Sequence, residues 1–358
     1  MCDAVATEKD IACLESLYAG RKPYHGEMHD HSNSGGKSDG KELFINWKKE
    51  IMPEKNMDFA TIVDHKQSMH MRLPEWDSTM FIGGTEAGTM ILGRGDQQSG
   101  MHYNMIFADP DKQDQLVSEF SEYKFSGGDK GIFVYPRFEP DRFRKVVKRV
   151  RELGGFFVNV HPKYKNYLHS DDPMDYLYGE YTGIEIMTGH GGNMTRQENM
   201  DAYNLWVELL NLGQIVYATS GADSHRRSHT HSLATVYSEK RDAHTYLGYF
   251  REGDFTAGPV GIRMAVGDVT TGGHTDFTGK RLVVAAGDFH CQELKPDHQY
   301  RLDVYNEKGL VCSQEFDSAE IAYFAMDAEN CRYYRANVYD VTDDYLFAVG
   351  NPVWNSNF

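Results

Sequence analysis

Short apolar runs alternate with helical patterns between about residues 58 and 219. Each run has the length of a buried strand, and the segments between the runs carry the period of a helix. This alternation is typical of βα units and argues against an all-β sandwich in this part of the chain. The predicted strands cover residues 58–64, 80–86, 102–108, 155–161, 183–188 and 214–220.

Two segments between these strands have a clear helical period. In residues 141–153 the apolar side chains form one stripe, made by Phe143, Val146, Val147, Val150 and Leu153. The Arg and Lys side chains of this segment fall on the opposite face, which predicts an amphipathic helix. Residues 197–212 are richer in apolar side chains, and Gly213 supplies the stop that helices commonly use at their C-terminal end.

After about residue 257 the helical period disappears. The remaining segments alternate apolar and polar positions and are broken by Gly, Asn and Asp, which predicts strands joined by turns. We therefore divide the chain into an N-terminal helical extension (1–23), an α/β domain (24–257) and a small β-rich domain (258–358).

The net charge of the chain argues against polyanionic binding partners. The sequence has 37 Lys and Arg against 53 Asp and Glu, a formal net charge of −16. A chain this acidic has no general attraction for nucleic acid or for anionic lipid, so we expect a small-molecule substrate and no membrane partner. Its 16 histidines offer the neutral nitrogen ligands that divalent metal ions prefer.

The N-terminus lacks a basic segment followed by an apolar one, and no window holds about 18 uninterrupted apolar residues. The five cysteines lie far apart with no CxxC pair, which favours a reducing compartment. These features predict a soluble cytoplasmic protein, although a signal peptide removed before this sequence begins would leave no trace. The sequence leaves the oligomeric state open.

Histidine and acidic residues recur at the ends of the predicted strands. The set comprises His29, His31, His65, Glu86, His102, His161, Asp223 and His225. In an extended chain His29 and His31 project to the same face and can bind one ion together. Each residue taken alone is explained as well by an ordinary polar or capping role. Because a barrel of parallel strands brings their C-terminal ends to one rim, the repeated placement favours a metal centre.

Six short motifs and a single His follow one another along the chain in the order HDHS, SDG, IVDH, GTE, His102, NVHP and GADSH. This series resembles the motif set of the PHP family, named for polymerase and histidinol phosphatase domains, over about residues 24–258. The resemblance implies a distorted (β/α)7 TIM-like barrel, here followed by a small all-β domain. It also implies two or three Zn, Mn or Fe ions and, as in most standalone members, phosphoesterase activity.

Carried over to this sequence, the resemblance implies three ligand sets. The first is His29, His31, Glu86 and Asp223; the second is Asp39, His65 and His225; the third is Glu86, His102 and His161, with Glu86 as a bridge. Asn33 to Lys37 make the loop before Asp39 longer than the family pattern. Asp39 therefore either closes the second set, helped by the conformational freedom of Gly35 and Gly36, or is carried away by the loop.

Several further residues are candidates with an equally ordinary alternative. Glu86 and Asp223 are candidate catalytic residues as well as ligands. Arg226 and Arg227 follow His225, and Lys66 follows His65, so these cations either hold a substrate phosphate or are solvated surface charges. His190, His229 and His231 are either outer partners of the ligands or solvated loop histidines. We favour a solvated helix face over a nucleic-acid surface for the basic side of residues 141–153.

These observations lead to a metal-dependent hydrolase, specifically a phosphoesterase that cleaves a small phosphomonoester or nucleotide by attack of a metal-bound hydroxide. Asn351-Pro352-Val353-Trp354 resembles the tail of carbaryl-hydrolase-like PHP proteins, which introduces a carboxylic ester or carbamate hydrolase as an alternative. A non-catalytic metal-containing binding module is an alternative of another class. The sequence does not name the substrate, because loops shape the pocket.

Overall fold

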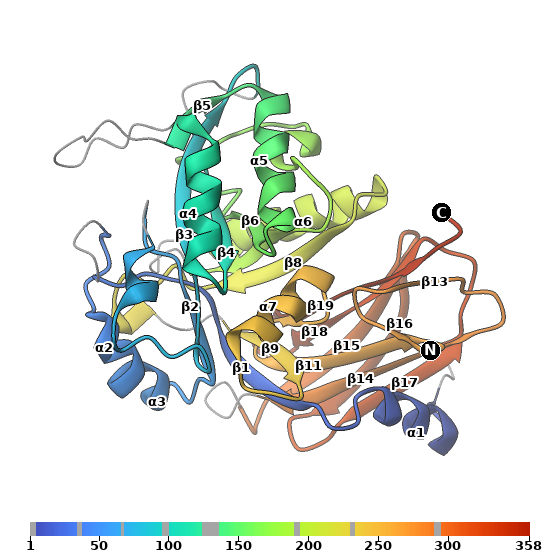
Figure 1. The fold of residues 1–358 in the computed structure, drawn as a ribbon. Coiled ribbons are helices and arrows are strands. Elements are labelled where there is room, and N and C mark those ends of the chain that lie inside the picture. The colour runs from blue at the N-terminus through green and yellow to red at the C-terminus, as the bar shows by residue number, and fades with distance from the viewer. Residues whose placement is uncertain are drawn as a thin grey trace. The chain divides into compact units, whose positions relative to one another are not determined.

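The computed structural model describes residues 5–33, 38–65, 68–94, 100–123, 136–189, 194–229, 233–289 and 295–358 (Figure 1). The chain is mixed α/β, with a large sheet and a strand-rich C-terminal part. It divides into two compact units. Unit 1 comprises residues 1–26, 233–241 and 248–358, and unit 2 comprises residues 27–232 and 242–247.

Unit 2 is built on strands that follow the order β1-β2-β3-β4-β6-β7-β8. Their bounds are β1 (Lys22–Asp30, of which residues 27–30 belong to this unit), β2 (Phe59–Ile62), β3 (Phe81–Ile91), β4 (Met101–Phe107), β6 (Phe156–Val160), β7 (Thr182–Thr188) and β8 (Val216–Gly221), with β5 (Arg137–Phe138) paired to β3. All six strands predicted from the apolar runs are present, within a few residues of the expected bounds.

The sheet of unit 2 differs in two respects from a closed barrel of parallel strands. The pairs β2–β3, β6–β7 and β7–β8 are parallel, whereas β4 runs antiparallel to both β3 and β6. The connection from Ile91 to Met101 is shorter than the dozen residues that a parallel crossover needs. Among the described residues, the two ends of the strand path meet at an isolated bridge between Asp30 and Ser224, and no continuous ladder between described strands closes the sheet.

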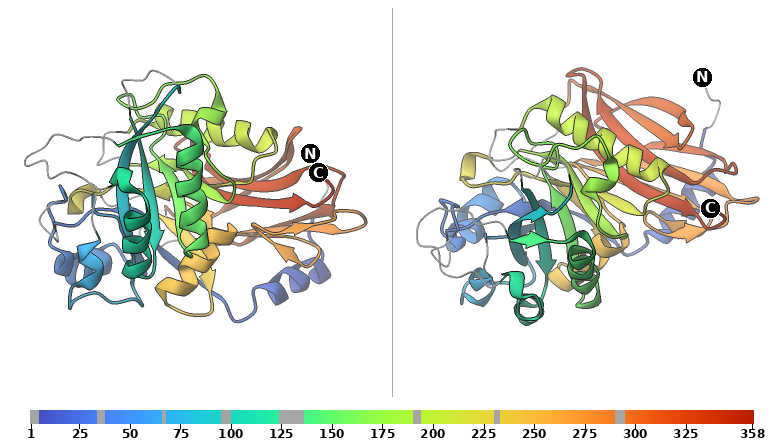
Figure 2. Two further views of the ribbon diagram at one scale, coloured as in Figure 1. Left: turned by 45° about the horizontal axis from the view of Figure 1, so that its top comes forward. Right: turned by 90° about the horizontal axis from the view of Figure 1, so that it is seen from above.

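The helices of unit 2 follow the predicted apolar periods. Helix α5 (Pro140–Glu152) buries Phe143, Val146, Val147 and Val150, as the stripe predicts. Helix α4 (Pro110–Glu119) lies beside α5 (Figures 1 and 2). Helix α4 packs on β3 and β4, and α5 packs on β6 and β4. Helix α6 (Arg196–Asn211) begins at a capping box made by Thr195 and Glu198, and it packs on β7 and β8.

The remaining elements of unit 2 are short turns of helix. They are α2 (Phe44–Asn46), a π-helical turn η1 (Trp47–Ile51), α3 (Met52–Glu54), and the 3-10 turns η2 (Met69–Arg72), η3 (Ser121–Tyr123), η4 (Pro173–Tyr176) and η6 (Arg227–His229). Helix α7 (Ala243–Glu252) contributes its first residues to unit 2 and its last to unit 1. Within the part of the chain that the structure describes, no helix is both long and apolar enough to span a membrane.

Unit 1 holds two groups of strands around one hydrophobic core. One follows the order β16-β15-β18-β19-β10-β9-β1, with β13 beside β19, and the other follows β12-β11-β14-β17. The bounds are β9 (Ala234–Ser238), β10 (Thr256–Ala257), β11 (Val260–Val266), β12 (Val269–Thr270), β13 (His274–Thr275), β14 (Arg281–Phe289), β15 (Gln299–Asn306), β16 (Gly309–Asp317), β17 (Ala322–Asp327), β18 (Tyr333–Asp340) and β19 (Tyr345–Asn355).

The division into units differs from the predicted domain boundaries. The predicted extension, residues 1–23, does contain a helix, α1 (Glu8–Leu17), but this helix packs on β11 and β14 and belongs to unit 1. Strand β10 pairs with both β9 and β19, so two segments placed before residue 258 join the C-terminal strands. Hydrogen bonding between distant strands sets this division, and hydrophobic periodicity does not report it.

Candidate metal centre

The predicted ligands of unit 2 come from the ends of several strands. His29 lies in β1 and His31 directly follows it; both are fully buried, with ring centroids 5.3 Å apart. His65 follows β2, His161 follows β6, and Asp223 with His225 follow β8. These residues lie at one edge of the sheet because β1, β2, β6 and β8 end there.

Glu86 and His102 reach the same edge by a different route. Glu86 lies in the middle of the long strand β3, and its backbone N–H bonds the carbonyl of Val63, the residue after β2. His102 is the second residue of β4. Since β4 is antiparallel to its neighbours, its beginning lies beside their C-terminal ends.

The nine predicted ligands gather into three groups whose ligand atoms lie within 4.8 Å of one another. The groups are His29, His31, Glu86 and Asp223 (the central group); His31, Asp39, His65 and His225 (the Asp39 group); and Glu86, His102 and His161 (the His102 group). His31 joins the first two groups, and Glu86 joins the first and third. These groups can hold metal ions, and the sets agree with those that the resemblance implies, with His31 added to the second.

In the central group, nitrogen and carboxylate oxygen atoms converge. His31 Nε2 lies 3.0 Å from both Glu86 Oε2 and Asp223 Oδ1, and His29 Nε2 lies 3.4 and 3.5 Å from the same two atoms. Neither Nε2 makes a contact with hydrogen-bond geometry. Around an ion with bonds of about 2.1 Å, tetrahedral ligand atoms are about 3.4 Å apart. The observed spacing therefore fits ligands that share one cation.

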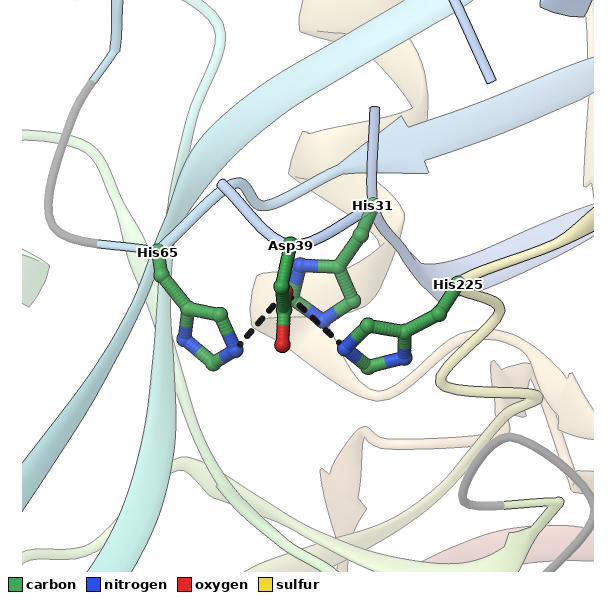
Figure 3. A group of neighbouring side chains, drawn as sticks. All are labelled: His31, Asp39, His65 and His225. Carbon is green, nitrogen blue, oxygen red and sulfur yellow. Dashed lines mark ion pairs between the residues drawn. The ribbon is translucent and has the colours of Figure 1, made fainter. Parts of the chain in front are cut away.

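The Asp39 group also brings imidazole nitrogen atoms close to a carboxylate oxygen, but at a more exposed position (Figure 3). Asp39 Oδ1 lies 3.1 Å from His225 Nε2 and 3.5 Å from His65 Nε2. The ring of His31 stacks on the rings of His65 and His225, with centroids 4.6 and 4.3 Å apart. The Asp39 side chain is 47% exposed, so this group is open to solvent on one side.

The longer loop does not carry Asp39 away, because its two ends are tied together. The backbone N–H of Asn33 bonds the carbonyl of Glu42 at 2.7 Å. Between them, Gly40 passes so close to Ser32 that a Cβ at Gly40 would lie 2.7 Å from Ser32 backbone atoms. A glycine after Asp39 thus permits the close approach that places the carboxylate between two imidazoles.

The His102 group is the most compact of the three. Glu86 Oε1 lies 2.5 Å from His102 Nδ1 and 3.2 Å from His161 Nε2. Two residues of the centre have backbone angles that non-glycine residues seldom adopt, since φ is 35° at His161 and 50° at Asp223. Such conformations cost free energy and occur preferentially at functional sites, where they direct a side chain that an extended strand would point elsewhere.

Glu185 in β7 supports two ligands and was not predicted from the sequence. Its Oε1 lies 3.0 Å from His29 Nδ1, and its Oε2 accepts a hydrogen bond from the backbone N–H of His161 at 3.0 Å. A carboxylate that receives the second ring nitrogen of a ligand histidine fixes its tautomer and orientation. A Cβ at Gly221 would lie 2.4 Å from His29 Cβ and 2.7 Å from Glu185 Oε1, so glycine is needed there. A lone Glu within the apolar run GIEIMT was the available signal.

Asp64 and His70 form a second buried support. Asp64 accepts hydrogen bonds from Ser32 N–H at 2.6 Å and from Ser32 Oγ at 2.7 Å, which fixes the backbone directly after His31. The Asp64 Oδ2 atom also lies 3.1 Å from His70 Nδ1, and both side chains are fully buried. His70 lies in η2, outside every motif, so only the folded chain reveals this partner.

The neighbouring histidines influence the pKa values of two ligand carboxylates, those of Glu86 and Asp39. Burial alone would raise the pKa of Glu86, but the neighbouring charges of His65, His102 and His29 hold it well below its usual range. Burial likewise opposes ionisation of Asp39, and the hydrogen bond from His225 with the charge of His65 lowers its pKa overall. Both carboxylates are therefore ionised at neutral pH, as metal ligands must be.

The pKa values of His65 and His31 are shifted in opposite directions. Burial lowers the pKa of His65 to about 4, against the opposing charge of Glu86. Burial also acts to lower the pKa of His31, but the carboxylates of Asp223 and Glu86 raise it to about 10. At neutral pH these pKa values leave His65 neutral and His31 protonated, so His31 must release its proton before its ring nitrogen can serve a cation.

The structure gives the two candidate arginines different surroundings. Arg226 is exposed to solvent. Arg227 forms ion pairs with Glu50, at 2.8 Å, and with Glu54. These carboxylates belong to η1 and α3, so the guanidinium of Arg227 is already neutralised by them. The pairing arises because a residue next to a ligand in sequence need not point to the same side.

Several other candidates lie outside the described residues. These are Lys66, His190, His231 and the loop glycines Gly35 and Gly36. The side chain of His229 is likewise not described.

The basic face of α5 forms ion pairs within the unit. Arg142 bonds Glu122 and Arg149 bonds Glu119, both at 2.7 Å. This arrangement fits the solvated helix face that we favoured for residues 141–153.

No protein-family model matches this chain, and no curated protein matches it at a significant level. The ligand geometry of unit 2 is thus what supports a metal centre in this protein.

Proposed function

We propose that this protein is a metal-dependent hydrolase of PHP type and, specifically, a phosphoesterase that acts on a small phosphomonoester or nucleotide. The observation that carries the proposal is the sharing of ligands, because His31 and Glu86 each belong to two of the three groups. Shared ligands would hold neighbouring cations, and clusters of divalent ions are a common means of hydrolysing phosphate esters. We also propose that the strands of unit 2 correspond to the distorted barrel of that family.

The donor set supports two or three ions of the Zn, Mn or Fe type. Imidazole nitrogen suits all three metals, and carboxylate oxygen is a common second ligand. The residues that would hold the ions are His29, His31, Asp39, His65, Glu86, His102, His161, Asp223 and His225. When bound, such ions lower the pKa of a water molecule and neutralise charge on phosphate oxygens.

The residues of the chain have distinct tasks in this proposal. Glu86 is ionised and joins two groups, so it sets the position of one group relative to the other. Asp223 Oδ1 lies 3.0 Å from His31 Nε2 and 3.4 Å from His225 Nδ1, between the central group and the more exposed Asp39 group. Its carboxylate is placed to accept the proton of an attacking water. Glu185 holds His29 in the orientation that the central group needs.

The charge balance of the centre favours an anionic substrate despite the net charge of the whole chain, −16. Asp39, Glu86 and Asp223 supply three negative charges among the ligands. Two or three divalent ions would exceed that charge and leave the centre locally positive. A phosphate dianion is attracted to such a site, and the acidic surroundings discourage polyanions such as nucleic acid.

A carboxylic ester or carbamate hydrolase is a second candidate, and the position of Arg227 favours it. The ion pairs of Arg227 with Glu50 and Glu54 occupy the guanidinium that was expected to grip a phosphate. An uncharged ester needs no such grip, and a water activated in the same way can attack a carbonyl carbon.

The two candidates are separated by substrates that share one leaving group. We would load the purified protein with Zn, Mn or Fe separately, measure the ion content, and compare p-nitrophenyl phosphate with p-nitrophenyl acetate and an aryl carbamate. The phosphoesterase proposal predicts the highest kcat/KM on the phosphate, and Asp223→Asn is the matched inactive control. Higher kcat/KM on the ester or carbamate would establish the second candidate, and bound metal without turnover on any substrate would establish a binding module.

A further inference from the structure

We propose that the hydroxyl group of Tyr167 is a further catalytic group, which donates a hydrogen bond to the leaving-group oxygen of a substrate bound beside the His102 group. This role rests on the proposed phosphoesterase function. Tyr167 belongs to none of the sequence motifs and offers no charged ligand atom, so neither the motif series nor the metal-ligand groups include it.

Tyr167 lies at the border between the His102 group and solvent. Its hydroxyl oxygen is 3.4 Å from His102 Nδ1, and its ring stacks on the ring of His161 with centroids 4.9 Å apart and planes 23° apart. The residue is partly exposed, whereas His102 and His161 are buried. The phenol hydroxyl therefore contacts the ligand group, while the residue that carries it is partly open to solvent.

The turn that carries Tyr167 is held in place by hydrogen bonds on both sides of the residue. The Tyr167 backbone N–H bonds the carbonyl of Tyr164 at 2.9 Å, and the Leu168 N–H bonds the carbonyl of Gly100, next to β4, at 3.1 Å. The hydroxyl of Tyr176 donates to the Leu168 carbonyl at 3.0 Å. A side chain fixed in this way loses little conformational entropy when it contacts a substrate, which is what a preorganised donor requires.

The chemistry of the neighbouring nitrogen decides what the hydroxyl can do. His102 Nδ1 lies 2.5 Å from Glu86 Oε1 and is the atom of His102 that faces the ligand group. One imidazole nitrogen carries either one proton or one lone pair. When that lone pair serves a cation, the nitrogen cannot accept from Tyr167 as well, so a substrate oxygen beside the His102 group can take its place as acceptor of the phenolic hydrogen.

A neutral donor is most effective at an atom where negative charge develops during the reaction. In phosphomonoester hydrolysis, the attacking water gives one proton to Asp223, and its oxygen forms a bond to phosphorus while the ester P–O bond breaks. The alcohol oxygen keeps the electron pair of that bond and takes its proton from solvent, and Tyr167 keeps its own proton. The hydrogen bond from Tyr167 therefore stabilises the alkoxide-like oxygen in the transition state more than it stabilises the intact ester.

The leaving group provides the test. We would prepare Tyr167→Phe and, as a matched control on the same turn, Tyr164→Phe, both in the full metal-loaded chain, and compare p-nitrophenyl phosphate with an alkyl monophosphate. A p-nitrophenolate carries its charge well, whereas an alkoxide needs a donor. We expect Tyr167→Phe to lower kcat on the alkyl substrate about 100-fold and on the aryl substrate less than about threefold. Tyr164→Phe should lower both by less than about threefold.

Metal content and fold give a readout that is independent of turnover. Elemental analysis of Tyr167→Phe should show the ion content of wild type, because the hydroxyl is not proposed as a ligand. Loss of an ion, or an equal loss of kcat on the two substrates, would overturn the leaving-group role and indicate a structural one. Kinetics identical to Tyr164→Phe would overturn it as well. A wild-type protein that hydrolyses neither phosphate would overturn the proposed function itself, and this role with it.

Discussion

Two clusters in this protein have the same residue types and differ in how their charges are balanced. In unit 1, His298, Asp340 and Asp343 offer ligand atoms within 4.8 Å of one another, as the groups of the metal centre do in unit 2. In unit 1, however, a lysine supplies positive charge, because Lys295 Nζ lies 2.5 Å from Asp343 Oδ2. In unit 2, the positive charges that act most strongly on Glu86 are those of three histidines.

The two clusters also differ in whether their ligand atoms have hydrogen-bond partners in the protein. Asp340 Oδ2 lies 2.8 Å from His298 Nδ1, and Asp340 Oδ1 accepts from the backbone N–H of Asp343 at 2.9 Å, so each oxygen has a protein partner. In the centre of unit 2, the Nε2 atoms of His29 and His31 each face two carboxylates without hydrogen-bond geometry. The comparison teaches that the proximity of ligand types is not sufficient, and that the central group differs from the unit 1 cluster because the Nε2 atoms of its two histidines lack a hydrogen-bond partner in the protein.

Substitution of Glu86 is the strongest way to test this comparison. Glu86→Gln keeps the shape of the side chain but removes the negative charge that joins the central group and the His102 group. We expect loss of at least one ion and a fall in kcat of more than about 100-fold, beyond the effect usual for outer partners. Elemental analysis and steady-state kinetics measure both, and Asp340→Asn in the other cluster is the matched control. Unchanged ion content in Glu86→Gln would remove the main support for a metal centre.

Asp39→Ala tests whether the exposed group is part of the centre. Asp39 Oδ1 lies close to His65 and His225, so its removal should lower the metal stoichiometry by about one ion. The His102 group does not contain Asp39 and should stay occupied. If ion content and turnover both equal those of wild type, Asp39 is a surface residue, and a stability change within about 0.5 kcal/mol should accompany that result.

Glu185→Gln tests whether a residue that only orients ligands affects metal binding, because it leaves every proposed ligand in place. A glutamine can still accept from the His161 N–H but no longer offers a charged acceptor to His29 Nδ1. We expect the affinity for metal to fall about 10- to 100-fold, with the same number of ions at saturation. Chelator competition measures the affinity, and exposed Glu180→Gln on the same unit serves as the control. An affinity equal to that of the control would contradict the proposed orienting role.

The smallest effect is expected in unit 1. Asp340→Asn should leave the metal content unchanged and lower the free energy of unfolding by about 1–3 kcal/mol, because a buried acceptor of His298 and of the Asp343 N–H is altered. Denaturant unfolding compares this variant with Asp297→Asn, an exposed change in the same segment. A drop in ion content would show that the unit 1 cluster also binds metal, and would break the distinction drawn above.

Helices and strands were predicted well where the pattern of buried apolar side chains determines the secondary structure. The apolar stripe of residues 141–153 becomes α5 because that helix buries one face. Each predicted apolar run becomes a strand because most of these strands are buried at every position. Strand direction was not predictable from the runs. The antiparallel course of β4 follows from the short connection after β3, and an apolar run carries no sign of its own direction.

The ligand types were also predictable, whereas their partners were not. Glu185 and Tyr167 contact residues distant in sequence, since Glu185 reaches His29 across 156 positions and Tyr167 reaches His102 across 65. His70 contacts the nearby Asp64 but belongs to no motif. Sequence adjacency also misplaced a residue, since Arg227 lies two positions after His225 and pairs with Glu50 and Glu54 instead. Side-chain direction at a strand end depends on backbone angles and on packing, which adjacency does not encode.

The sequence by itself determined which side chains are candidate metal ligands, because imidazole and carboxylate groups supply suitable ligand atoms and recur at the ends of the predicted strands. The tertiary structure alone decided how they combine. It brings His31 into two groups, leaves Asp39 between two imidazoles through the close passage of Gly40, and places Tyr167 beside His102. These relations depend on distances of 2.5–3.5 Å between side-chain atoms of separate segments, and only the packing of the folded chain sets such distances.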